Sequence, residues 1–127
     1  MELLLDTHTI IWYVEDAPQL PNHIRQKIKD GTNIIYVSVV SLWEISIKVH
    51  LGKLPLSGSF IDRIRFLRDC GFYILEVNLS HVIQLDTLEH HHKDPFDRML
   101  IAQALAEDFI IVGCDEVFDN YGARRLW

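Results

Sequence analysis

Short apolar runs alternate with amphipathic stretches along the whole chain. The apolar runs predict strands buried on both faces of a sheet, at residues 2–6, 34–38, 72–77 and 109–112. The stretches between them predict helices at residues 7–14, 22–29, 39–51, 59–70, 80–89 and 94–107, then a helical turn at 117–121 and an edge strand at 124–127. Asn22 and Ser80 are expected to cap the second and fifth of these helices. Alternating strands and helices predict an α/β fold, a three-layer α/β/α sandwich with a mainly parallel central sheet. No linker, repeat or low-complexity segment interrupts the pattern, so we expect residues 1–127 to form a single domain.

The clearest helix start lies at Asp94. Its carboxylate suits the N-cap position, and Pro95 suits the first helical position because its missing N–H costs nothing there. Asp97 then lies on the same helix face as three apolar residues that follow it: Ile101, Ala104 and Leu105. A carboxylate at the top of a core-facing row is either part of a cap or part of a site.

Composition limits the possible partners. The chain has 127 residues, 49% of them hydrophobic, and its 12 basic against 18 acidic side chains give a formal charge of −6. That balance argues against a broad basic surface that binds long nucleic acid through counterion release. An acidic protein can still act on nucleic acid if metal ions neutralise an acidic site.

Cysteine spacing and hydropathy suggest a reducing cytoplasm. Cys70 and Cys114 have no CxxC spacing, so neither a disulfide framework nor a zinc site is expected. Glu2 and Asp6 interrupt the apolar N-terminus, which therefore resembles neither a signal peptide nor an anchor. No apolar run approaches the ~18–20 residues of a membrane helix, so no membrane partner is expected.

Several acids fall near the predicted carboxyl ends of strands, where open parallel sheets bind ligands. Asp6 and Asp115 follow the first and fourth strands, and Glu44 lies just past the second. Asp94 and Asp97 begin the helix that leads into the fourth strand, so chain direction alone predicts that they lie at the opposite end of the sheet.

Each acid also has a purely structural interpretation. Ser41 with Glu44 fits a capping box, Asp97 complements a helix dipole, and Asp6 and Asp115 fit ordinary caps. Taken jointly, inward carboxylates without a basic partner would repel one another and raise each other's pKa, unless a hard cation neutralises them. Carboxylate oxygens suit Mg²⁺ or Mn²⁺ better than zinc. Such sites serve metal-assisted phosphodiester hydrolysis, in which the metal activates the attacking water.

Four segments together resemble one known family. They are Leu3–His8, Ser41–Ile45 with Gly52–Leu54 after it, His92–Ala104, and Asp115 with Phe118 and Tyr121. The chain resembles the PIN-domain nucleases, specifically VapC-type toxins of bacterial type II toxin–antitoxin systems, over essentially its whole length. The resemblance implies a four-acid site that holds Mg²⁺ or Mn²⁺ and cuts single-stranded RNA: Asp6, Glu44, Asp97 and Asp115.

The resemblance also implies partners and supporting residues. It implies a cognate antitoxin that lays an apolar helix on the domain and sends a basic side chain to the acids, and it implies a homodimer. It further implies that the fold brings Asp97 to the strand ends, which leaves Asp94 as the cap. Thr7 is a candidate for orienting the site through its hydroxyl. Arg98 is a candidate for holding a site carboxylate or a phosphate, with solvated helix surface as the alternative.

Gly113 departs from the family pattern, which usually has Ser or Thr two residues before the last acid. A catalytically weak or inactive PIN-like binding module that only pairs with a protein partner is therefore the alternative function. A phosphatase with Asp6 as nucleophile is disfavoured, because such enzymes of the haloacid type need a second acid where this chain has His8.

Other conspicuous residues have simpler interpretations. Three adjacent histidines, at positions 90–92, predict a polar loop before the capped helix more readily than a metal site, although His92 is also a candidate for orienting Asp94 or for RNA contact. Trp43 in its apolar helix is expected to pack against the fold or a partner. Arg63, Arg65 and Arg68 are expected to form a solvated face, with RNA contact as the alternative.

Overall fold

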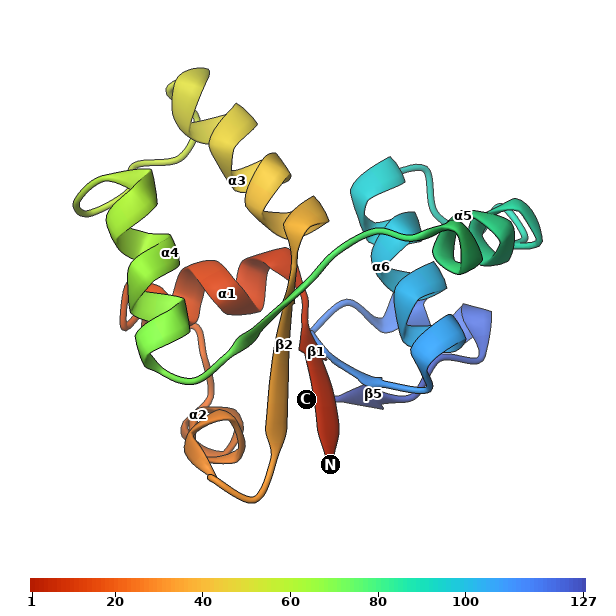
Figure 1. Cartoon of the computed structure of the whole chain (residues 1–127), viewed down its shortest axis with the longest axis horizontal. Coiled ribbons are helices and arrows are strands. Elements are labelled where there is room, and N and C mark those ends of the chain that lie inside the picture. The colour runs from red at the N-terminus through yellow and green to blue at the C-terminus, as the bar shows by residue number, and fades with distance from the viewer.

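A five-stranded parallel sheet forms the centre of the computed structural model, which describes all residues 1–127 (Figure 1). The strands lie in the order β3-β2-β1-β4-β5, and every neighbouring pair is parallel. Their bounds are β1 (Glu2–Leu5), β2 (Ile34–Ser38), β3 (Tyr73–Leu75), β4 (Ile110–Val112) and β5 (Arg125–Leu126). The helices are α1 (Thr7–Val14), α2 (Asn22–Lys29), α3 (Val39–His50), α4 (Phe60–Asp69), α5 (Leu79–Asp86), α6 (Pro95–Glu107) and the 3₁₀ helix η1 (Glu116–Tyr121).

Helices cover both faces of the sheet, so the predicted three-layer sandwich is confirmed. Successive side chains of a strand point to opposite faces, and the three leucines of β1 are all 0% exposed. Leu3 and Leu5 join the core beneath α1, α2 and α4, whereas Leu4 joins the core beneath α6 and η1. The strand is therefore apolar throughout because it is buried on both faces.

Some predicted details are wrong. Asn78, and not Ser80, caps α5: its Oδ1 accepts from the backbone N–H of His81, while His81 Nδ1 accepts from the N–H of Asn78. Histidine thus replaces the usual acid of a capping box. The third strand covers only Tyr73–Leu75, and Asn22 lies inside α2 and caps nothing.

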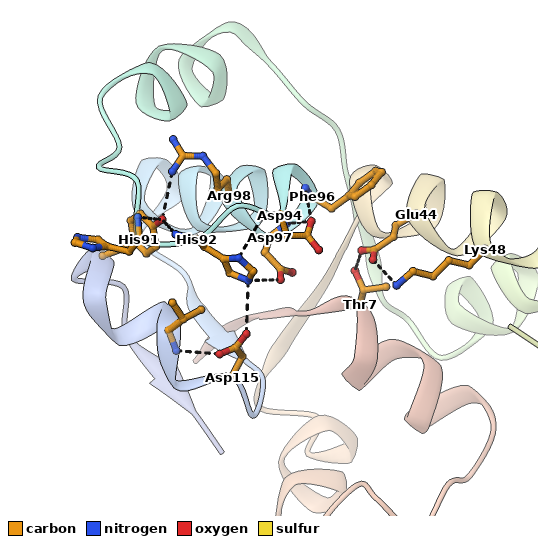
Figure 2. A network of polar contacts seen from close by, with 12 residues as sticks. Thr7, Glu44, Lys48, His91, His92, Asp94, Phe96, Asp97, Arg98 and Asp115 are labelled. Atoms are coloured by element: carbon orange, nitrogen blue, oxygen red, sulfur yellow. Dashed lines mark hydrogen bonds and ion pairs between the residues drawn. The ribbon is translucent and has the colours of Figure 1, made fainter. Parts of the chain in front are cut away.

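The helix α6 runs antiparallel to the strands, and this decides where Asp94 and Asp97 lie. A helix that leads into a parallel strand must carry the chain back from the carboxyl ends to the amino ends. The first turn of α6 therefore lies at the same end of the sheet as Asp6 and Asp115 (Figure 2). The prediction from chain direction, which placed these residues at the opposite end, is wrong.

No helix of the structure combines the length and the apolar character that crossing a membrane requires.

Candidate functional site

Three of the predicted acids are helix caps at the carboxyl ends of the strands. Asp6 Oδ1 accepts from the N–H of Thr9 at 2.8 Å, and Asp115 Oδ1 accepts from the N–H of Val117 at 3.0 Å. Asp94 Oδ1 accepts from the first turn of α6. The structural interpretation is therefore right for these three residues. In Asp6 and Asp115 the cap uses Oδ1, so Oδ2 remains for other partners.

Glu44 is a buried carboxylate in the interior of α3. Ser38 caps this helix by accepting from the N–H of Val40, so the predicted capping box of Ser41 and Glu44 is wrong. Glu44 is only 5% exposed, and both of its oxygens have partners. The Thr7 hydroxyl donates to Oε1 at 2.8 Å, and Lys48 Nζ lies 2.7 Å from Oε2. Thr7 thus orients Glu44 through its hydroxyl.

Asp97 lies between His92 and Glu44, and Figure 2 shows its carboxylate directed toward the imidazole. His92 Nε2 lies 2.9 Å from Asp97 Oδ2 and 3.6 Å from Asp115 Oδ2. His92 Nδ1 accepts from the N–H of Asp94, so the neutral ring carries its proton on Nε2. That N–H is not aligned with either carboxylate, and the buried Nε2 has no hydrogen-bond partner.

The gathered charges perturb two of the acids. The pKa of Asp97 is raised to about 6, mainly by burial; the negative charges of Asp94, Asp6 and Glu44 contribute to this rise, and His92 opposes it. Burial also raises the pKa of Asp6, and the charge of Asp115 adds to this rise. The charges of Asp6 and Glu44 therefore reach Asp97, and the charge of Asp115 reaches Asp6.

Gly113 lies directly against Asp6. A Cβ atom at this position would lie 2.5 Å from Asp6 Oδ2 and 3.1 Å from Phe118 Cε2. A serine or threonine cannot occupy this position unless Asp6 moves, which gives the departure from the family pattern a physical reason. The glycine gives the Asp6 carboxylate its present position.

Arg98 contacts none of the site acids. Its guanidinium donates to the backbone carbonyl oxygens of Glu89, at 2.7 Å, and Leu88, and to the Tyr121 hydroxyl. The interpretation of Arg98 as a holder of a site carboxylate is wrong for this structure. It instead fixes the segment between α5 and α6 to the first turns of α6.

The sequence interpretation assumed carboxylates without a basic partner: it missed Lys48, and it considered His92 only for orienting Asp94 or for RNA contact. Lys48 pairs with Glu44, and His92 faces Asp97 and Asp115. The Lys48 signal was present in the sequence, because residues four apart on a helix are neighbours. His92 gave no such signal, because its approach to Asp115 depends on tertiary structure.

The donor set fits a hard divalent cation. Ligand atoms of His92, Asp97 and Asp115 lie within 4.8 Å of one another. Since His92 Nε2 carries the proton, the carboxylate oxygens of Asp97 and Asp115 are the available donors, with Asp6 and Glu44 close enough to perturb Asp97. An all-oxygen set suits Mg²⁺ or Mn²⁺ better than zinc.

Sequence comparison connects this arrangement to a known family. Residues 3–124 match the sequence model of the PIN domain. Ribonuclease VapC16 from Mycobacterium tuberculosis is 39% identical over 69 residues, which are 51% of this chain. The match spans about half the length of that relative, 47%.

Solved structures share the fold over almost the whole chain. VapBC2 from Rickettsia felis, crystallised with a promoter DNA fragment, matches with a TM-score of 0.76 at 14% identity and covers 99% of this chain and 98% of that one. DNA-bound VapBC from Salmonella typhimurium gives 0.72 at 17% identity, covering 99% and 97%. VapBC-1 from nontypeable Haemophilus influenzae gives 0.70 at 17% identity, with the same coverage.

Proposed function

This chain belongs to the PIN domain family, and we propose from this premise that it is a divalent-metal-dependent endoribonuclease, the toxin of a toxin–antitoxin pair. One observation carries the proposal: Asp6, Glu44, Asp97 and Asp115 come from separate elements to the carboxyl ends of the strands, where the charges of Asp6 and Glu44 raise the pKa of Asp97 and that of Asp115 raises the pKa of Asp6. Asp6 and Glu44 are buried, and negative charge gathered in this way is costly without a cation. A divalent cation among carboxylates serves phosphodiester hydrolysis. The similarity to Ribonuclease VapC16 supports RNA as the substrate.

The site residues have distinct roles in this proposal. Asp6, Asp97 and Asp115 hold Mg²⁺ or Mn²⁺, and Glu44 joins them from α3. The bound ion supplies Lewis-acid stabilisation and a water of lowered pKa. Thr7 keeps Oε1 of Glu44 oriented, and Lys48 competes with the cation for Oε2. Asp94 positions Asp97 by capping α6, and the Nε2–H of His92 stabilises the charge of Asp97 and Asp115.

A cognate antitoxin and a homodimer complete the proposal. Solved structures of the same fold are VapBC complexes, which supports an antitoxin partner. Trp43 of α3 and Leu51, which directly follows this helix, are 63% and 62% exposed and offer an apolar surface to a partner, one of the two positions expected for Trp43. Cys70 and Cys114 are free, as suits a reducing cytoplasm.

The substitution Asp6→Asn tests the function. Asparagine caps helices as well as aspartate does, so α1 and the fold should be retained while one site charge is lost. We expect RNA cleavage in Mg²⁺ and growth inhibition to be abolished. Asp69→Asn, which changes an exposed acid at the end of α4, is the matched control and should cleave normally. Cleavage by Asp6→Asn at the wild-type rate would falsify the site.

A further inference from the structure

A pocket of about 790 Å³ lies beside the acid site, between α5, the segment that joins α5 to α6, and the first turns of α6. Apolar side chains from α5 and the following segment line one part of it: Val82, Leu85 and Leu88. Basic and imidazole side chains line the other part, among them His90, Lys93 and Arg98. The volume falls in the range of ligand pockets, roughly 300–1,000 Å³.

The pocket contains two cationic side chains, Lys93 and Arg98, and one acid, Asp86, which forms no ion pair with either of them. Arg98 is held by backbone carbonyl oxygens and the Tyr121 hydroxyl, which fix its position without cancelling its charge. Lys93 forms no ion pair, whereas His91 is paired with Glu89. Arginines elsewhere are mostly matched, as Arg25 is by Asp16 and Arg125 by Asp119. The pocket therefore offers two cationic side chains without an ion-pair partner to a ligand.

His92 connects the pocket to the acids. Its side chain lines the pocket, and its Nε2 lies 2.9 Å from Asp97 Oδ2 (Figure 2). A single strand whose scissile phosphate lies at the acids can therefore place a neighbouring nucleotide in the pocket. This step rests on the proposed function.

We propose that this pocket binds one nucleotide of single-stranded RNA next to the scissile phosphate. Lys93 and Arg98 contact its phosphate, and the apolar wall of Val82, Leu85 and Leu88 receives the base. A nucleotide has a group for each part of the pocket, its phosphate for the cations and its base for the apolar wall, whereas a purely acidic peptide has a group for the cations alone. His90 and His91, which have no role in the metal site, thereby gain one in substrate binding.

Binding of a fluorescently labelled single-stranded RNA of mixed sequence tests the proposal. All variants carry Asp6→Asn to prevent turnover, and Lys93→Ala and His90→Ala are added singly. Lys93 and His90 are exposed, so their truncation should leave the fold intact, which thermal unfolding checks. Arg98 is left unchanged because it holds the segment in place. Lys29→Ala, an exposed lysine at the end of α2, is the matched control.

We expect Lys93→Ala to lower the slope of log affinity against log salt by about 0.7, the value of one phosphate contact on a single strand. His90→Ala should weaken binding with less effect on the slope, and Lys29→Ala should change neither. Polyglutamate of matched charge should compete poorly. An unchanged salt slope and an unchanged affinity in Lys93→Ala would overturn the proposal that the pocket binds a nucleotide. Competition by polyglutamate as strong as that by unlabelled RNA would overturn it too.

The two proposals fail in different ways. Cleavage by the wild-type protein is measured separately. RNA binding that depends on Lys93, without any cleavage, would contradict only the proposed nuclease activity. Cleavage of RNA together with RNA binding that does not depend on Lys93 would contradict only the proposed nucleotide binding in the pocket. Absence of RNA binding by the Asp6→Asn chain together with absence of cleavage by the wild type would contradict both.

Discussion

At the scale of single residues, the contact between Gly113 and Asp6 sets the shape of the site. Asp6 uses Oδ1 to cap α1, and its Oδ2 lies where a side chain at position 113 would begin. The hydroxyl residue that the family usually carries there cannot be added to this chain without moving Asp6. The position of the Asp6 carboxylate therefore depends on glycine at position 113, because any side chain there would displace it.

Gly113→Ser should accordingly damage the protein rather than improve it. The new Cβ would overlap Asp6 and crowd Phe118, and overpacking of this kind costs about 1–3 kcal/mol. We expect a lower free energy of unfolding in urea and slower RNA cleavage, because the displaced Asp6 no longer faces the other acids. Gly31→Ser is the control, since nothing lies within 4 Å of a Cβ there. Faster cleavage by Gly113→Ser, with stability unchanged, would contradict this account.

At the scale of elements, the N-terminus of α6 controls where Asp97 lies. Asp94 accepts from the N–H groups of Phe96 and Asp97 and so fixes the first turn from which Asp97 projects. Asp94→Ala should cost about 1 kcal/mol through the lost cap. Asp94→Asn should retain both stability and cleavage, since asparagine caps equally well. Thermal unfolding and RNA cleavage of both variants distinguish a capping role of Asp94 from a role in metal binding. Loss of cleavage in a stable Asp94→Asn protein would show that Asp94 binds the metal.

Local signals in the sequence predicted most elements and caps. Leu3 to Leu5 form a strand, and Asp94 begins a helix, because each outcome depends on a few neighbouring residues. The cap of α5 was misplaced because Asn78 pairs with a histidine instead of an acid. The capping box at Glu44 was wrong because the preceding strand passes directly into α3, with Ser38 as the cap.

The site was predicted less completely, because its assembly depends on tertiary structure. Its four acids came from family resemblance, while reasoning from chain direction alone misplaced Asp97. That error came from neglecting that a connecting helix runs back along the sheet. The His92 contact with Asp115 and the carbonyl partners of Arg98 join segments whose approach no local pattern encodes. Lys48 is different, since its spacing from Glu44 made the ion pair predictable.

At the scale of the whole molecule, the gathered acids make stability depend on pH and metal together. The pKa of Asp97 is raised from 3.8 to about 6 in the folded chain, mainly by burial. Between these two values the folded state holds a proton that the unfolded state has released. The contribution of Asp97 to the stability of the metal-free protein is therefore present below about pH 4 and is lost as the pH rises through about 6.

Mg²⁺ should reverse this loss, because a cation and a proton compete for the same carboxylate. Below pH 6, each unit of falling pH should weaken the apparent affinity for Mg²⁺ by up to about tenfold, whereas above about pH 7 the affinity should level off. The rise in melting temperature on adding Mg²⁺ should grow correspondingly from about pH 5 to about pH 8. Asp97→Asn should remove the pH dependence of the stability of the metal-free protein between about pH 4 and 6, and most of the rise in melting temperature on adding Mg²⁺. Asp69→Asn should retain both. A Mg²⁺ shift that is equal at all pH values, or unaltered in Asp97→Asn, would mean that Asp97 does not bind the cation.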